Sequence, residues 1–226
     1  MASFGLIFDF DGVIADSEVL ANVVFAEHVS RLGLPMTLED ALTLYVGKGW
    51  REVAADLEGR LGKSLPENFI ADLKVKTAEA MRKDLREVVG ATMFIRHFAE
   101  VPRCIASSSP LNYLRLCLDT LGLSAEFGDH VYSADMVARG KPHPDIFLFA
   151  ADQIRVAPAD CIVIEDSVSG VRASLSAGMT TIGLCAGSHS RPGHARRLVD
   201  AGAIQTAETW NDALKIVSSL RAENTG

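Results

Sequence analysis

The sequence predicts an α/β protein in which a parallel sheet carries helices on both faces and a helical domain is inserted after the first strand. Short apolar runs alternate with amphipathic helical stretches over most of the chain, as in βαβ units. This alternation stops between residues 17 and 88, where we expect no strand. With 226 residues, 48% of them apolar and 23% charged, the chain is large enough to fold around its own core.

The predicted strands are short and mostly apolar. They are Phe4–Phe10, Arg103–Ser107, His130–Ser133, Cys161–Glu165 and Thr180–Leu184. Helices are expected at Leu111–Leu121, Asp145–Gln153 and Val168–Ala177. Ser109 and Pro110 are expected to supply the N-cap and the first residue of the earliest of these helices. Because strand–helix–strand units are right-handed, the strands should be parallel.

Residues 17–88 are expected to form a small all-helical domain. Apolar residues recur there at helical spacing, at Leu20, Val24, Val29 and Leu32. Capping boxes at Thr37–Asp40 and Ser64–Glu67 indicate two further helix starts. The sequence therefore predicts one domain from residues 1–16 and 89–226 and a second from residues 17–88.

Charge and cysteine content exclude several classes of protein. The net charge of −7 argues against nucleic-acid binding, which needs a basic face. Four widely spaced cysteines without a CxxC pair are expected to be reduced and mostly buried. No apolar run approaches the roughly 18 residues of a membrane span, and the first residues lack the pattern of a signal peptide. We therefore expect a cytoplasmic protein, with a monomer as the default state because nothing marks an obligate interface.

Pairs of carboxylates end two of the predicted strands. Asp9 and Asp11 are two residues apart, so they project to the same side, and Glu165 and Asp166 follow a second apolar run. Turn formation and helix capping explain some of these residues, but an unpaired Asp9 between two phenylalanines would be costly. The carboxyl ends of parallel strands meet at one edge, where α/β folds bind ligands. Oxygen ligands without His or Cys indicate Mg²⁺ there.

Two other strand ends supply groups that can bind an anion. Ser107 and Ser108 place hydroxyl and backbone N–H groups at the start of a helix. Lys141 lies in a loop stiffened by two prolines. A lone lysine is normally a solvated charge and a serine cluster is normally a helix cap, but the position of both after strands of the same sheet favours a functional role.

In their order along the chain, the segments at Asp9, Ser107, Lys141 and Glu165 resemble the four motifs of the haloacid dehalogenase superfamily of aspartate-nucleophile phosphotransferases. The stretches FDFDGVIADSE, GKPHPDIF and IEDSVSG resemble the subgroup with a helical cap inserted after the first strand. That subgroup includes β-phosphoglucomutase, phosphoglycolate phosphatase and sugar-phosphate phosphatases. The resemblance covers the whole chain. It implies a Rossmann-like core and a cap that closes over the site and excludes water.

The resemblance also implies roles for individual residues. Asp9 is the nucleophile that becomes an aspartyl phosphate, and Asp11 protonates the leaving oxygen and then deprotonates the attacking water. Ser107 and the backbone N–H that follows it, that of Ser108, hold the phosphoryl oxygens. Lys141 neutralises the charge that Asp9 shares with the phosphoryl group.

A Mg²⁺ ion is implied by the same resemblance. Its ligands are the Asp9 carboxylate, the Asp11 backbone carbonyl and Asp166, with Glu165 binding directly or through water. Asp11 also distinguishes the chain from true dehalogenases, which lack this second aspartate because a halide leaving group needs no proton.

The expected function is Mg²⁺-dependent hydrolysis of a small phosphorylated metabolite, a sugar, sugar-acid or polyol phosphate. One alternative is a sugar phosphomutase. β-Phosphoglucomutase has a histidine in its first cap helix where this chain has Ala21, and His28 lies two turns further on, which favours hydrolysis without eliminating the mutase. Another alternative is a sugar-phosphate-binding regulatory protein without turnover, although every catalytic position is filled.

Two loops are candidates for substrate contacts. In the cap segment Tyr45–Arg51, the predicted substrate-binding residues are Gly47, Lys48, Trp50 and Arg51. Packing within the cap explains Trp50 equally well. The loop Gly187–His194 contains two histidines with too few further ligands for zinc. A polar loop on the surface explains these histidines better than a contact with substrate or cap.

Overall fold

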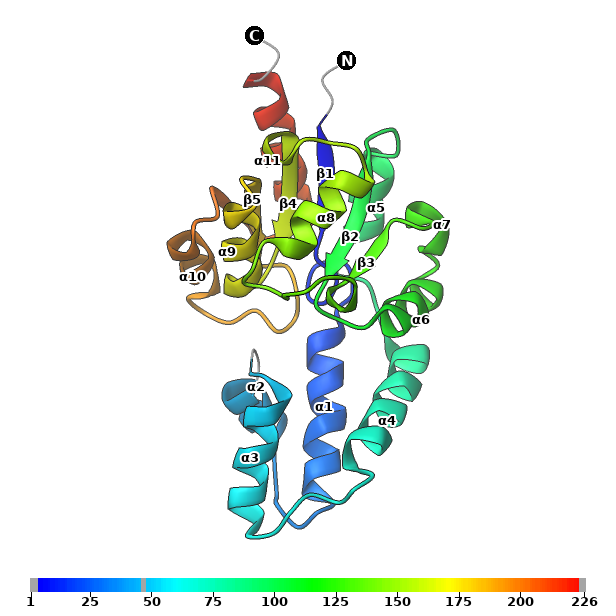
Figure 1. Ribbon diagram of the computed structural model, residues 1–226, viewed down its shortest axis with the longest axis vertical. Helices are drawn as coiled ribbons and strands as arrows, with labels where there is room; N and C mark the ends of the chain where they lie inside the picture. The colour runs from blue at the N-terminus through cyan, green and yellow to red at the C-terminus, as the bar shows by residue number, and fades with distance from the viewer. Residues whose placement is uncertain (1–3, 46–47, 224–226) are drawn as a thin grey trace. The chain divides into compact units, whose positions relative to one another are not determined.

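The computed structural model describes residues 4–45 and 48–223. In this part of the chain, six parallel strands form one sheet in the order β3-β2-β1-β4-β5-β6. The strands are β1 (Gly5–Phe8), β2 (Arg103–Ser107), β3 (Val131–Ser133), β4 (Cys161–Glu165), β5 (Thr180–Leu184) and β6 (Gln205–Ala207). The predicted α/β class with a Rossmann-like parallel sheet is confirmed (Figure 1).

Helices connect these strands. They are α5 (Ala91–His97), α6 (Leu111–Leu121), α7 (Ser124–Phe127), α8 (Asp145–Gln153), α9 (Val168–Ser176), α10 (His194–Ala201) and α11 (Trp210–Glu223). Two short 3₁₀ turns lie at Ala134–Met136 and Pro158–Asp160. The three helices predicted for this region are present with boundaries that differ by at most one residue.

The two central strands, β1 and β4, are buried on both faces, as their continuous apolar runs predict. On one face, Ile7 packs in a cluster with Phe147 of α8. On the other face, the Phe8 ring lies 6.0 Å from those of Phe94 in α5 and Trp210 in α11. Each of these side chains is fully buried and contributes roughly 1.5–3 kcal/mol to folding. Helices on both faces therefore hold the central strand in place.

The first strand is shorter than predicted. It ends at Phe8 because the chain then turns back on itself, with the N–H of Ile14 donating to the carbonyl of Phe10 and the N–H of Gly12 to that of Ala15. Gly12 has a φ of +76°, a conformation that favours glycine. Asp9 and Asp11 therefore lie in a turn at the carboxyl edge of the sheet.

The sixth strand was not predicted. Gln205–Ala207 is only three residues long and its first side chain is exposed, so it lacks the apolar run of a buried strand. It pairs in register with β5, and the N–H of Cys185 donates to the carbonyl of Ala207 at 2.8 Å. Backbone pairing rather than side-chain hydrophobicity forms this edge strand.

The chain divides into two compact units. The sheet domain comprises the residues up to Asp16 together with those from Arg86 on, and the helical domain comprises Ser17–Leu85. The helical domain ends at Leu85, three residues before the boundary expected from the sequence. Backbone hydrogen bonds explain the difference, since the N–H of Asp16 donates to Arg86 and that of Val88 to Ile14.

The helical domain contains α1 (Ser17–Ser30), α2 (Leu38–Tyr45), α3 (Trp50–Leu61) and α4 (Phe69–Asp84). The capping box at Thr37 is present, because the Asp40 N–H donates to Thr37 Oγ1 at 3.1 Å and the Thr37 N–H to Asp40 Oδ2 at 2.8 Å. The predicted box at Ser64–Glu67 is wrong. The N-cap of α4 is Asn68 and the helix begins at Phe69, while the Leu65 N–H before it donates to Glu58 of α3.

Two further predictions concern the chain as a whole. The four cysteines, Cys104, Cys117, Cys161 and Cys185, are free thiols and are buried, as expected. Among the helices of the described residues, none combines the length and the apolar character needed to cross a membrane.

Candidate active site

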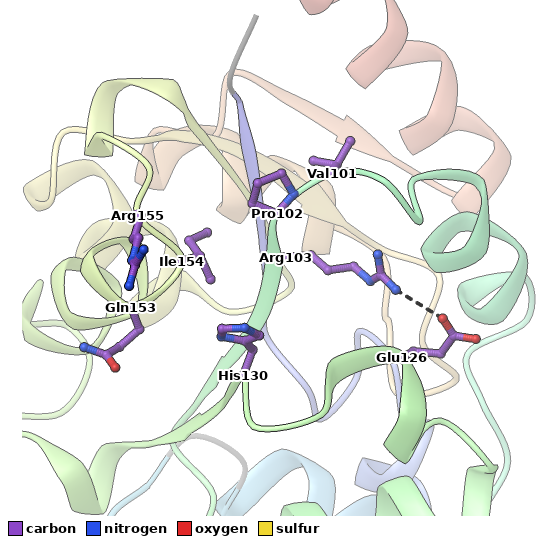
Figure 2. Close-up of a pocket in the computed structure, with 8 residues that line it drawn as sticks. All are labelled: Val101, Pro102, Arg103, Glu126, His130, Gln153, Ile154 and Arg155. Carbon is purple, nitrogen blue, oxygen red and sulfur yellow. Dashed lines mark hydrogen bonds and ion pairs between the residues drawn. The ribbon is translucent and has the colours of Figure 1, made fainter. Parts of the chain in front are cut away.

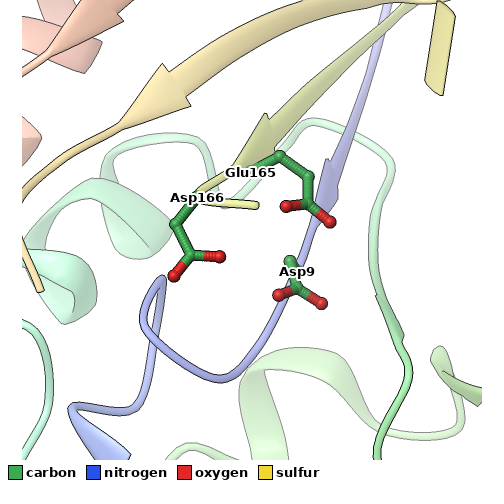
Figure 3. Close-up of side chains that lie close together, drawn as sticks. All are labelled: Asp9, Glu165 and Asp166. Carbon is green, nitrogen blue, oxygen red and sulfur yellow. The ribbon is translucent and has the colours of Figure 1, made fainter. Parts of the chain in front are cut away.

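Three buried carboxylates meet at the carboxyl edge of the sheet. Oxygens of Asp9, Glu165 and Asp166 lie within 4.8 Å of one another (Figure 3). They converge because β1 and β4 are neighbours, with Phe8 paired to Ile164, and the Asp9 N–H donates to the Ile164 carbonyl at 3.0 Å. Strand order reverses between these two strands, where open α/β sheets bind ligands.

Lys141 lies between two of these carboxylates. Its Nζ is 2.8 Å from Asp9 Oδ1 and 2.6 Å from Glu165 Oε1, and only 3% of its side chain is exposed. The loop that carries it is closed by Arg139, whose guanidinium donates to both carboxylate oxygens of Asp145 at 2.8 and 3.1 Å. A lysine far from both aspartate segments in sequence is thus a buried part of the cluster.

The cluster has more negative than positive charge. Burial raises the pKa of Asp9 well above its usual value, and the opposing effect of Lys141 does not cancel this. Burial, with the Glu165 charge next to it, also raises the pKa of Asp166. Burial lowers the pKa of Lys141, but its two carboxylate partners raise it by more. Three carboxylates facing one lysine fit a hard divalent cation, which would hold them ionised.

Glu165 is held by the start of α9. Its Oε2 accepts from the N–H of Ser167 at 2.8 Å and from the hydroxyl of Ser167 at 2.9 Å. Ser167 is also the N-cap of α9, accepting from the Gly170 N–H at 3.0 Å. A side chain at Gly170 would overlap the Glu165 carboxylate. The IEDSVSG stretch therefore uses its serine and glycine to orient its glutamate.

Asp11 lies outside this group of three and has its own partners. Ser109 Oγ donates to Asp11 Oδ2 at 2.5 Å and the Tyr113 hydroxyl donates to Oδ1 at 3.0 Å. The prediction that Ser109 caps α6 is wrong, because Pro110 occupies the N-cap position and makes no side-chain cap bond. The role of Tyr113 was not predicted. Its place in the first turn of a helix that begins at the strand ends is the signal that could have found it.

Ser107 and Ser108 differ in their surroundings. Ser107 ends β2 and is buried, and its Oγ accepts from the Ser109 N–H at 3.1 Å. Ser108 is exposed. Since Phe8 pairs with Ile105, Ser107 lies at the same edge of the sheet as Asp9.

Comparison with known proteins agrees with this site. A family model described as haloacid dehalogenase-like hydrolase matches residues 5–178. The chain belongs to this family. This hydrolase is a phosphatase-type enzyme, and several of its curated relatives are named phosphatases.

Relatives of the hydrolase include two sugar-phosphate phosphatases of Escherichia coli. It is 25% identical to 6-phosphogluconate phosphatase over 186 residues, covering 82% of this chain and 84% of the relative. It is 30% identical to fructose-1-phosphate phosphatase over 179 residues, covering 79% and 94%. A solved haloacid dehalogenase-like protein of unknown function from Agrobacterium tumefaciens has 32% identity and a TM-score of 0.86, covering 97% and 99%.

The predicted substrate-binding residues lie in the helical domain of the hydrolase. Gly47 is outside the described residues. Lys48 and Arg51 are exposed, and Lys48 Nζ lies 3.3 Å from Glu52. Trp50 is half-buried and stacks on Phe69, with ring centroids 5.9 Å apart and ring planes inclined by 20°. This contact supports the packing explanation for Trp50.

The loop after β5 contacts the carboxylate cluster. His189 Nε2 lies 3.0 Å from Asp166 Oδ2, and His194 Nε2 lies 2.6 Å from the backbone oxygen of Asp166. Burial lowers the pKa of His194, which favours the neutral ring. The interpretation of these histidines as solvent-exposed polar residues of a surface loop is therefore wrong. Their contact comes from the pairing of β5 with β4, which sequence spacing does not reveal.

A separate cavity of about 500 Å³ lies at the opposite edge of the sheet (Figure 2). Arg103 and His130, near the amino ends of β2 and β3, line it together with Arg155, which follows α8. Arg103 is engaged by Glu126 at 3.1 Å and by two backbone carbonyls. Among the residues that the structure describes, none of the predicted site residues lines this cavity.

Proposed function

We propose that this hydrolase is a Mg²⁺-dependent phosphatase that acts on a small sugar, sugar-acid or polyol phosphate through an aspartyl phosphate on Asp9. The observation that carries this proposal is the buried contact of Asp9 with Lys141, beside two further carboxylates at the edge of the sheet. The sugar-phosphate phosphatases among its relatives support the substrate class.

The reaction proceeds in two displacements. In the first, an Asp9 oxygen attacks phosphorus, the ester P–O bond breaks, and the leaving oxygen takes a proton from Asp11. In the second, Asp11 takes a proton from water as that water attacks phosphorus. The bond between phosphorus and Asp9 then breaks, releasing phosphate and restoring both carboxyl groups to their starting states. Ser109 and Tyr113 hold the Asp11 carboxyl group throughout.

The cation site uses the acidic group described above. Asp9, Asp166 and the Asp11 backbone carbonyl would hold Mg²⁺, with Glu165 directly or through water. When bound, Mg²⁺ supplies positive charge that polarises the phosphoryl group and offsets the carboxylates. Lys141 adds a fixed charge next to Asp9. Ser107 and the N–H of Ser108 hold the phosphoryl oxygens.

Hydrolysis is favoured over the mutase reaction by the surroundings of His28. This histidine is the nearest to the Ala21 position, but it is buried in the helical domain with its Nε2 3.2 Å from the Phe69 carbonyl. The Asp11 carboxyl group is instead held by two hydroxyls of the sheet domain. A histidine that assists the acid/base residue, as in the mutase, is therefore not supported.

The helical domain selects the substrate in this proposal. Lys48 and Arg51, the second residue of α3, are exposed cations that can contact the sugar or its acid group, and Gly47 is assigned to the segment before them. Trp50, the first residue of α3, packs on Phe69 of α4. Replacing Arg51 with Ala should raise KM for the best substrate with little change in kcat.

The first experiment is phosphate release from sugar, sugar-acid and polyol phosphates and from phosphoglycolate, with and without Mg²⁺. Asp9→Asn should abolish release, whereas Asp129→Asn, at an exposed position of the sheet domain, should retain it. Release from a narrow group of these compounds would support the proposal. Binding of the same compounds without release would overturn hydrolysis and favour a regulatory protein.

A further inference from the structure

The loop Gly187–His194 contacts both the backbone and the side chain of Asp166. The Asp166 backbone oxygen can only accept a hydrogen bond, so His194 Nε2 is the protonated nitrogen of this contact at 2.6 Å. His194 Nδ1 in turn lies 2.7 Å from Ser190 Oγ, and in the neutral ring it accepts from that hydroxyl. The peptide at Asp166 is therefore tied to α10, which begins at His194.

His189 contacts the side chain of the same residue. Its Nε2 is 3.0 Å from Asp166 Oδ2, and 11% of its side chain is exposed. The ring also packs against the turn after β1, since a Cβ at Gly12 would lie 2.6 Å from His189 Cε1 and would overlap Asp166 Oδ2. The carboxylate is thus confined between the imidazole and a glycine backbone.

The loop is fixed at a second point. The N–H and the hydroxyl of Ser188 both donate to Asp16 Oδ1, at 2.9 and 2.8 Å. Asp16 is the last residue of the first segment of the sheet domain. His189 is therefore preceded by a residue anchored to the β1 turn and followed by one bonded to His194, so its ring has a defined place beside Asp166.

We propose that His189 is a positioning residue that orients the Asp166 carboxylate for cation binding. The inference rests on the proposed function, in which Asp166 is a metal ligand. The Nε2–H of His189 binds one oxygen of a carboxylate that lies next to the like charge of Glu165, and leaves the other oxygen for the cation. Loss of a hydrogen bond that orients a metal ligand typically weakens metal binding by about 10–100-fold.

The test uses the full chain and Mn²⁺ as the probe, with the dissociation constant measured by electron paramagnetic resonance at constant pH. His189→Phe keeps a ring but loses the N–H, and His189→Leu is a second variant without a donor. Both should bind Mn²⁺ about 10–100-fold more weakly than wild type. His189→Gln keeps an N–H donor at similar reach and should recover most of the affinity. His97→Leu, at an exposed histidine of α5, should bind like wild type.

Activity supplies a second readout. For the Phe and Leu variants, a higher Mg²⁺ concentration should restore kcat, because the reacting groups Asp9 and Asp11 are unchanged. Wild-type Mn²⁺ affinity in the Phe or the Leu variant would overturn this inference and leave the proposed function standing. Equally weakened Mn²⁺ binding in the Phe and Gln variants would do the same. A wild-type chain that binds neither Mn²⁺ nor Mg²⁺ would overturn the proposed metal dependence as well.

Discussion

Tyr113 donates a hydrogen bond of 3.0 Å to Oδ1 of Asp11, a residue 102 positions earlier in the chain. Ser109 donates to the other oxygen of the same carboxylate. Ser109 precedes α6 and Tyr113 lies in its first turn, and the start of this helix is at the carboxyl edge of the sheet. The sheet domain by itself therefore orients the carboxyl group that we propose as the acid/base.

Replacing Tyr113 with Phe should lower kcat about 10-fold and leave KM nearly unchanged. A hydrogen bond between uncharged groups contributes up to about 1.5 kcal/mol, and 1.4 kcal/mol corresponds to a factor of ten in rate. Steady-state kinetics with the best substrate measures the effect. Tyr132→Phe is the control, because its hydroxyl contacts His130 rather than Asp11. An unchanged kcat in the Tyr113 variant would contradict the positioning of Asp11.

Lys141→Met should destabilise the metal-free protein by about 3–5 kcal/mol, because it leaves two buried carboxylates without their partner. Urea unfolding at pH 7 with a chelator measures the change. Adding Glu165→Gln should recover part of the stability without restoring activity. Lys215→Met, at an exposed lysine paired with Asp212, should change stability little. Equal stability of the Lys141 and Lys215 variants would argue against a buried ion-pair network.

The metal-free protein should lose stability relative to Asp166→Asn as pH rises above about 4, where aspartates of the unfolded chain ionise. Burial raises the native pKa of Asp9 and Asp166, so the native state binds protons more tightly than the unfolded chain. That contribution is present at low pH and is lost as pH rises through the native pKa values. Mg²⁺ should reduce the loss, because cations bind the ionised carboxylates.

Thermal unfolding of both proteins from pH 4 to pH 8, with chelator and with Mg²⁺, measures this dependence. If the Tm of wild type and variant changed with pH in parallel under chelator, Asp166 would not titrate differently in the native and unfolded states. A Mg²⁺ effect on Tm that does not grow with pH would argue against cation binding to these carboxylates.

Gly12→Ala should reduce both stability and cation affinity. The residue has a φ of +76°, where an L side chain costs about 1–2 kcal/mol, and the added methyl group would overlap Asp166 Oδ2. Gly62→Ala is a matched control, with a φ of +66° and no atom within 4 Å of the added Cβ. It should share the backbone cost and leave Mn²⁺ binding unchanged. Equal Mn²⁺ affinity in the two variants would show that Asp166 tolerates a displaced turn.

Much of the fold follows from local patterns in the sequence. Continuous apolar runs such as Cys161–Glu165 predict strands buried on both faces, and these are present. Strand β6 was missed because Gln205–Ala207 carries no such run and forms by backbone pairing with β5. The start of α4 was misplaced, since its N-cap is Asn68 and the Leu65 N–H in the segment before it is bonded to Glu58 of α3. Local signals fail where a contact distant in sequence decides the conformation.

The convergence of Asp9, Glu165 and Asp166 was determined by the sequence, because parallel strands end at one edge and both strands close with carboxylates. The partners of these groups were decided only by the tertiary structure. Tyr113 on Asp11 and His189 on Asp166 are side-chain hydrogen bonds between segments far apart in the chain. Strand ends have a common edge whatever their side chains, whereas a hydrogen bond requires two particular atoms at about 3 Å, and packing alone sets that distance.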